Sequence, residues 1–194
     1  MTLGCMAALC VTSCLNNDDN DNSQTGLTPA EKALCYSTLA GDYTGDLLYM
    51  AVDESERTEA VDTIDGSWYI PTDSTLIITD FPSALLAEHV SQPPLKEALA
   101  DAPDQTIKCQ VYYTQLTPIE FLVNPYPLTY TLNYGGGTHE VQVYFYANNA
   151  YSFGSYDPTE KKLFIKIIEG AIYVDGQQTN YLTSTPFLFV AQKK

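Results

Sequence analysis

The sequence predicts a mainly β fold, an antiparallel meander that forms a barrel or a sandwich and carries a few short helices. The 194 residues, 45% of them hydrophobic, suffice for the core of one domain. Fifteen tyrosines, 11 glycines, 11 prolines and only 17% charged residues favour strands joined by many turns. An open sheet of so many strands would expose its edges, so we expect closure into a barrel or packing into two sheets, and the pattern leaves both open.

The domain begins with a capping-box pattern, in which the side chains of Thr28 and Glu31 each accept a hydrogen bond from the backbone amide of the other residue. Pro29 occupies the first helical position. This predicts a helix to about Leu39, followed by Gly41 as its cap. Alternation and turn residues then predict strands at 43–52, 67–70, 75–79, 107–116, 119–123, 128–134, 139–147, 151–156, 163–174 and 187–190, and short helices at 83–90 and 95–102.

Turn sequences separate the later strands. Three consecutive glycines at 135–137 lie between two strands and do not open a helix, so we interpret them as a turn and not as a phosphate loop. Asp175-Gly176 is the strongest hairpin signal of the chain.

The first 13 residues form an uncharged apolar run that is too short to span a bilayer, which is typical of a signal peptide. A signal peptide normally opens with Lys or Arg, and none occurs before Glu31, so we expect the start codon further upstream. The run ends in Val11-Thr12-Ser13-Cys14, which resembles a bacterial lipobox. We therefore expect Cys14 to be acylated, by palmitate or a similar chain, and to anchor the protein; Cys5 and Cys10 are weaker alternatives.

Residues 14–27 are expected to be a tether, because 16–24 contain no apolar residue and several aspartates. The domain proper is then 28–194. The tether is similar to the acidic tract that follows the lipidated cysteine in Bacteroidota lipoproteins and directs export to the outer face of the outer membrane. We expect a lipid-anchored protein that faces the cell exterior.

The composition argues against several functions. The formal net charge of −15 repels phosphate backbones, so nucleic acid is a poor partner. His89 and His139 lie apart from any metal-ligand spacing, and we expect neither a metal nor a cofactor. Acid pairs such as Asp62 with Asp65, or Asp42 with Asp46, would suit a glycosidase dyad only in a cleft, and we interpret them as solvated surface.

Two cysteines remain in the domain. Cys109 alternates with apolar residues of its strand and is expected to point into the core. An oxidising envelope permits a disulfide between Cys35 and Cys109, while two buried thiols are the equal alternative.

Aromatic side chains recur on the polar faces of the predicted strands. They are Tyr112, Tyr144, Tyr146 and Phe164. If these faces are open to water, the rings form an amphipathic platform that stacks on sugars or anchors a protein. If the short helices cover them, the rings are a second core layer.

The stretch 36–45, together with 78–82 and 171–176, resembles a Bacteroidota lipoprotein family, the domain of unknown function numbered 4840, over roughly residues 30–192. The Tyr43-Thr44-Gly45 opening also resembles calycin-like domains, which implies a barrel. The family supplies no functional residue. We expect a non-enzymatic surface module that binds a glycan or a protein; a carboxylate-dependent hydrolase and an accessory subunit of an envelope complex are the alternatives.

Overall fold

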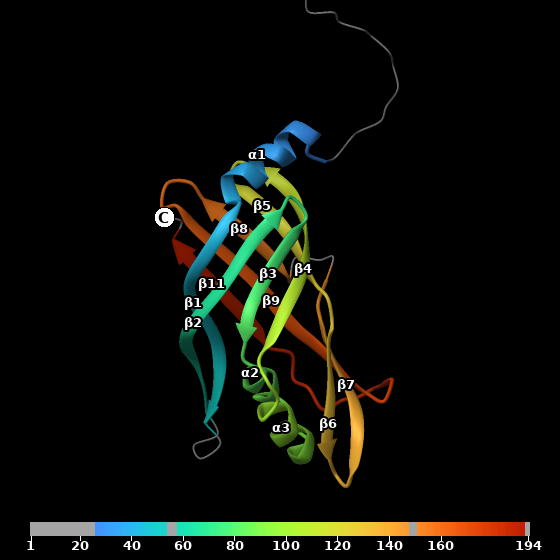
Figure 1. Cartoon of the computed structure of the whole chain (residues 1–194). Coiled ribbons are helices and arrows are strands. Elements are labelled where there is room, and N and C mark those ends of the chain that lie inside the picture. Colours follow the sequence, from blue (N-terminus) through green and yellow to red (C-terminus); the bar gives the residue numbers. More distant parts are fainter. Residues whose placement is uncertain (1–25, 54–57, 148–150, 193–194) are drawn as a thin grey trace, which may run out of the picture.

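The computed structural model describes residues 26–53, 58–147 and 151–192. Within these ranges the chain forms three short helices and a closed antiparallel barrel of eight strands (Figure 1). The expected signal peptide, Cys14 and most of the expected tether lie outside the described residues.

The elements follow one another in the order α1 (Pro29–Leu39), β1 (Gly41–Asp53), β2 (Thr58–Thr72), β3 (Thr75–Phe81), α2 (Ser83–Ala87), α3 (Pro93–Ala100), β4 (Gln105–Leu116), β5 (Ile119–Pro125), β6 (Leu128–Tyr134), β7 (Gly137–Phe145), β8 (Phe153–Asp157), β9 (Lys162–Val174), β10 (Gln177–Gln178) and β11 (Pro186–Gln192).

The barrel is an up-and-down meander. Strands β1 to β5 pair in sequence, β8 joins β5, β9 joins β8, and β11 pairs with both β9 and β1 to close the ring. Closure removes the free edges that an open sheet would expose. Of the two architectures that the sequence left open, the barrel is the correct one.

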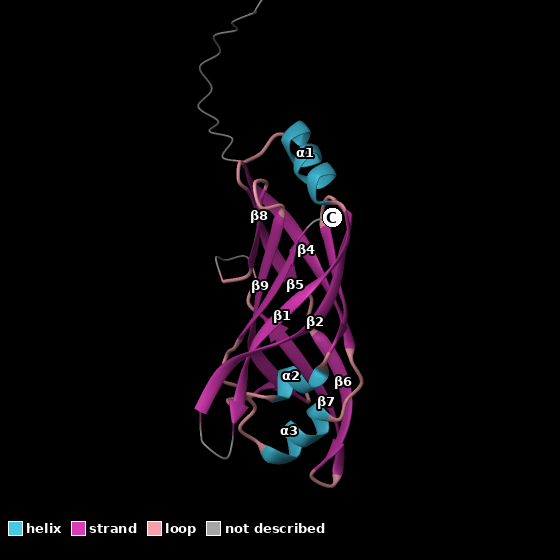
Figure 2. Cartoon of the chain, turned by 90° about the vertical axis from the view of Figure 1, so that its left-hand side faces the viewer, coloured by secondary structure: helices cyan, strands magenta, loops and turns pink. Residues whose placement is uncertain are grey.

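A smaller sheet extends from the barrel, because β9 is longer than its barrel partners. Its first part pairs with β8 and β11, and its last residues pair with β7 and β10. Strand β6 pairs with β7 along its whole length. We call the sheet formed by β6, β7, β10 and the end of β9 the extension. It projects from the barrel end that carries α2 and α3, whereas α1 lies at the other end (Figures 1 and 2).

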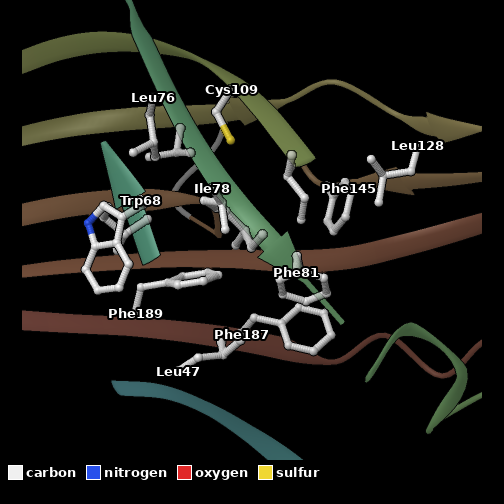
Figure 3. Close-up of a cluster of buried hydrophobic side chains, with 14 of the residues drawn as sticks. Leu47, Trp68, Leu76, Ile78, Phe81, Cys109, Leu128, Phe145, Phe187 and Phe189 are labelled. Carbon is white, nitrogen blue, oxygen red and sulfur yellow. The ribbon is translucent and has the colours of Figure 1, made fainter. Parts of the chain in front are cut away.

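Large side chains fill the barrel interior (Figure 3). Trp68 and Phe189 meet edge to face at 5.5 Å, and Phe81 and Phe187 do so at 5.0 Å. Phe121 is 1% exposed, and a Cβ on Gly154 opposite it would overlap its ring. An eight-stranded barrel is just wide enough for side chains to fill, and here they do.

Both domain cysteines are buried free thiols, and the structure contains no bridge between them. Cys35 on α1 lies 3.9 Å from the carbonyl oxygen of Gln115, at one end of β4. Cys109 lies six positions earlier on the same strand, which is about 20 Å along it. A disulfide requires Cα atoms within about 7 Å, so the separation explains why the thiols are not joined.

The predicted elements agree closely with the structure, and the capping box of Thr28 and Glu31 is present. The largest difference is β2, which begins at Thr58 and not at Ser67. The segment 58–66 pairs with the far end of β1 as a protruding hairpin with most positions exposed. Without a buried face, it has no alternation of apolar residues that a sequence argument could detect.

Candidate functional site

The outer face of the extension carries a row of polar and aromatic side chains. Register places Thr129, Gln142, Tyr173 and Gln178 directly opposite one another across the four strands. Residues directly opposite in a sheet share a face. This face therefore presents hydroxyl, amide and phenol groups side by side.

Tyr144 lies one register step further along β7 and packs against Tyr173, with ring centroids 4.9 Å apart. Its hydroxyl donates to Oε1 of Gln142 at 3.2 Å, and the Tyr173 hydroxyl donates to Oε1 of Gln178 at 3.2 Å. Tyr144 remains 36% exposed. Each hydroxyl is thus held by a neighbouring amide, which restrains the orientation of its ring.

A second tyrosine pair continues this face. Tyr146 packs against Tyr151 with centroids 5.6 Å apart, and the two rings are 40% and 59% exposed. A Cβ on Gly170 would lie 3.3 Å from Cδ2 of Tyr146, so the ring rests on the bare backbone of β9. Ala171 lies opposite Tyr144. Small residues on β9 therefore leave room for these rings, whose planes are tilted by 53° and 51° within the two pairs. We call Tyr144, Tyr146, Tyr151 and Tyr173 the tyrosine face.

The four aromatic residues singled out from the sequence do not form one patch. Tyr144 and Tyr146 lie on the tyrosine face. Tyr112 is 45% exposed on β4, which is separated from β9 in the barrel by β5 and β8. Phe164 is half-buried on the barrel part of β9, where its ring meets Phe153 at 5.9 Å. Helices α2 and α3 contact each other and β6, and they leave Tyr112, Tyr144 and Tyr146 exposed.

A cleft of about 760 Å³ lies on the inner side of the extension, next to the β6–β7 turn. His139 lines it and donates from Nδ1 to Oδ2 of Asp175 at 2.8 Å. Sequence reasoning treated His139 as an ordinary surface residue and Asp175 only as part of a turn. The pairing of β7 with β9 brings them together, and that register was the signal that was missing.

A carboxyl group is buried where the barrel meets the extension. Glu169 is fully buried, and neither of its side-chain oxygens has a hydrogen-bond partner among the described residues. Burial raises the pKa of Glu169 well above its usual value. Burial, and to a smaller extent the charge of Glu169, raises the pKa of Tyr130 to about 12. The hydrogen bond between Tyr130 and Ser83 acts in the opposite direction and lowers this pKa. Glu169 is enclosed and is therefore no part of an open site.

The acid pairs considered for hydrolysis lie on β1 and β2. Asp42, Asp46, Asp62 and Asp65 are all exposed, and Asp46 lies directly opposite Asp65. In the described ranges no three His, Cys, Asp or Glu side chains cluster closely enough to hold a metal ion. No helix among the described residues is long and apolar enough to cross a bilayer.

The fold and its exposed faces define a small filled β-barrel with an appended sheet. The family model for DUF4840, a domain of unknown function, matches residues 38–174. The chain belongs to this family, which confirms that part of the expectation from its sequence. No curated protein and no solved structure matches the chain.

Proposed function

We propose that the chain is a lipid-anchored, non-enzymatic surface module that binds a glycan on the tyrosine face. The observation that carries the proposal is the two tyrosine contacts, Tyr144 with Tyr173 and Tyr146 with Tyr151, on and next to one side of the extension. Tyrosine offers a large rigid apolar surface and a polar rim at low entropic cost. Sugars present the same combination of apolar C–H faces and hydroxyl groups.

The size of the face favours a small ligand over a protein. Four strands span about 14 Å, and the positions from Gln142 to Tyr146 span about 14 Å along β7. The resulting area of roughly 200 Å² is far below the ~800 Å² per partner of a standard protein interface. A short stretch of glycan fits this footprint.

The chemistry of the face favours an uncharged ligand. Thr129, Thr131, Gln142 and Gln178 surround the rings, and Glu140 at the tip is the charged residue of this part of β7. The net charge of −15 repels polyanions over the whole molecule. Neutral amides and hydroxyls pair with sugar hydroxyls as both donors and acceptors.

The expected anchor supports a role outside the cell. A random coil as long as the expected tether, residues 14–27, has an end-to-end distance of about 20 Å, which would hold the domain clear of lipid head groups. The described chain enters at α1, and the extension projects from the opposite end of the barrel (Figures 1 and 2). An acylated Cys14 would thus present the tyrosine face away from the membrane.

The test is a glycan array probed with the intact chain and with a Tyr144→Ala, Tyr146→Ala variant. The proposal predicts saccharide binding that the double variant loses. Tyr112→Ala is the matched control, because it removes an equally exposed tyrosine from β4 and should bind like the wild type. If every saccharide binds the double variant as tightly as the wild type, or if the chain captures a protein but no glycan, the proposal is contradicted.

The hydrolase requires two carboxylates that share a cleft, and the four acids considered for it are exposed on β1 and β2. No contact of the described residues favours an accessory subunit.

A further inference from the structure

The cleft on the inner side of the extension is a concave site that the tyrosine face does not include. It lies between the β6–β7 turn and the segment after β10, and its lining includes Gln92, Tyr134, His139, Gln177, Asn180 and Tyr181. Register places His139 opposite Leu132, which is buried, so His139 is on the opposite face of the sheet from Gln142 and Tyr144. A volume of about 760 Å³ is within the range of ligand sites in proteins.

The lining combines apolar and aromatic surface with uncharged polar groups. The chain has 24 acidic and 9 basic residues, yet among the described residues that line the cleft there is no Asp, Glu, Lys or Arg. Amides from Gln92, Gln177 and Asn180 supply both donors and acceptors. A charged ligand would find no counter-charge in this lining, whereas the amides can pair with hydroxyl groups of a neutral ligand.

A carboxylate fixes the orientation and the tautomer of His139. Asp175 accepts from Nδ1 of His139 through Oδ2 at 2.8 Å and from the amide of Glu140 through Oδ1 at 3.0 Å. These bonds lower the pKa of Asp175, the one from His139 most strongly, so the carboxylate stays ionised and accepting. With the proton on Nδ1, the neutral ring presents Nε2 as an acceptor.

Tyr134 completes the wall beside His139. Its ring packs on the imidazole with centroids 4.5 Å apart and planes tilted by 34°. Burial, and then the charge of Asp175, raises the pKa of Tyr134, so its hydroxyl remains a neutral donor. Both residues line the cleft, so this wall combines an aromatic surface with an imidazole and a phenol hydroxyl.

From this arrangement we infer that the cleft is a second binding site, for one uncharged sugar unit, and that Nε2 of His139 accepts a hydrogen bond from a sugar hydroxyl. The site is distinct from the tyrosine face, because His139 lies on the opposite face of β7 from Tyr144. Gln178 borders both, since it lines the cleft and accepts from the Tyr173 hydroxyl. The role of Asp175 is to position His139; it does not contact the ligand.

Two variants of the intact chain test the inference on a panel of neutral oligosaccharides built from glucose, mannose, galactose or xylose. His139→Phe keeps a ring against Tyr134 and removes the acceptor. Asp175→Asn keeps an acceptor for the Glu140 amide but presents an NH₂ group to Nδ1, which places the proton on Nε2. Each should weaken saccharide binding about fivefold to tenfold, as expected for one lost hydrogen bond.

Three further measurements make the outcome decisive. Asp65→Asn removes a charge from a distant exposed position of β2 and should leave binding unchanged. Nitrogen NMR should show the proton on Nδ1 of His139 in the wild type and on Nε2 in Asp175→Asn, which establishes that the variant is folded and altered as intended. The Tyr144→Ala, Tyr146→Ala variant should retain the binding that depends on His139.

The inference is overturned if no neutral saccharide binds in a way that depends on His139, or if Asp175→Asn moves the proton and binding stays the same. It is equally overturned if the cleft binds a peptide but no sugar. If no saccharide binding depends on Tyr144 and Tyr146 but binding that depends on His139 is found, the proposed function fails and the cleft site stands, so the two failures can be distinguished.

Discussion

A glycine in β8 allows Phe121 to fill the barrel, and this contact gives a quantitative test of the packed interior. Gly154 lies directly opposite Phe121 on β5. A Cβ at Gly154 would overlap Cζ, Cε2 and Cε1 of the ring. The ring is 1% exposed, so it has no solvent-filled space into which it can turn.

Gly154→Ala should therefore destabilise the fold by about 1–3 kcal/mol, the usual cost of an overpacked core. For a domain of this size each kcal/mol lowers Tm by about 2–4 °C, so the expected loss is about 2–12 °C. Phe121→Leu alone should cost about 1–3 kcal/mol, because complete removal of a buried Phe costs about 3–5 kcal/mol.

The double variant separates overlap from a general weakening of β8. Leucine lacks the ring atoms that the new Cβ would meet, so Gly154→Ala should cost at least about 1 kcal/mol less in the Phe121→Leu background. Urea unfolding followed by circular dichroism gives all four free energies of unfolding. Gly26→Ala, where a Cβ meets no atom within 4 Å, is the control and should change stability little. Additive costs, or an unchanged Gly154→Ala variant, would refute the packing argument.

Three more predictions concern charges and the anchor. Glu169→Gln should match the wild type in stability near pH 4 and exceed it increasingly as the pH rises. The raised pKa of Glu169 means that its protonated form stabilises the folded state below the pKa of the unfolded state, and this contribution is lost as the pH rises. Measurement of Tm from pH 4 to 8 checks this, and the exposed Glu97→Gln is the control, whose Tm difference from the wild type should not change with pH. Asp65→Lys should stabilise the chain by about 0.2–1 kcal/mol, because it replaces the like charge opposite Asp46 with an attractive one. In urea unfolding the added free energy of unfolding should be smaller at high salt than at low salt, and a variant less stable than the wild type would contradict the prediction. Cys14→Ser should move the protein from the membrane to the soluble fraction of cells, and unchanged partition would exclude Cys14 as the anchor.

The sequence predicted most strands because their buried faces alternate. In β6, for example, Leu128, Tyr130 and Leu132 are buried while Thr129 and Thr131 are exposed, and the predicted bounds 128–134 match those observed. The same reasoning could not detect residues 58–66 of β2, which have little buried surface. It also could not choose between barrel and sandwich, because that choice depends on β11 pairing with both β1 and β9, far apart in sequence.

The candidate sites were predicted only in part, for a similar reason. The alternation of β7 showed that Tyr144 and Tyr146 share a face, and the structure has both exposed. Their partners Tyr173 and Tyr151 come from other parts of the chain, and only pairing brings them near. The contact between His139 and Asp175 joins residues 36 apart in the sequence. Residue types alone do not reveal such a contact.

The central claim is that the barrel is a filled scaffold and that recognition takes place on the extension. The most direct measurement is an NMR titration of the intact chain with a saccharide selected on the array, following the aromatic ring signals. The account predicts that the signals of Tyr144, Tyr146 and Tyr173, or those of Tyr134 and His139 for a ligand of the cleft, shift with saccharide concentration while those of Trp68 and Phe121 stay in place. Saturable shifts confined to Trp68 and Phe121 would show a ligand inside the barrel and contradict it.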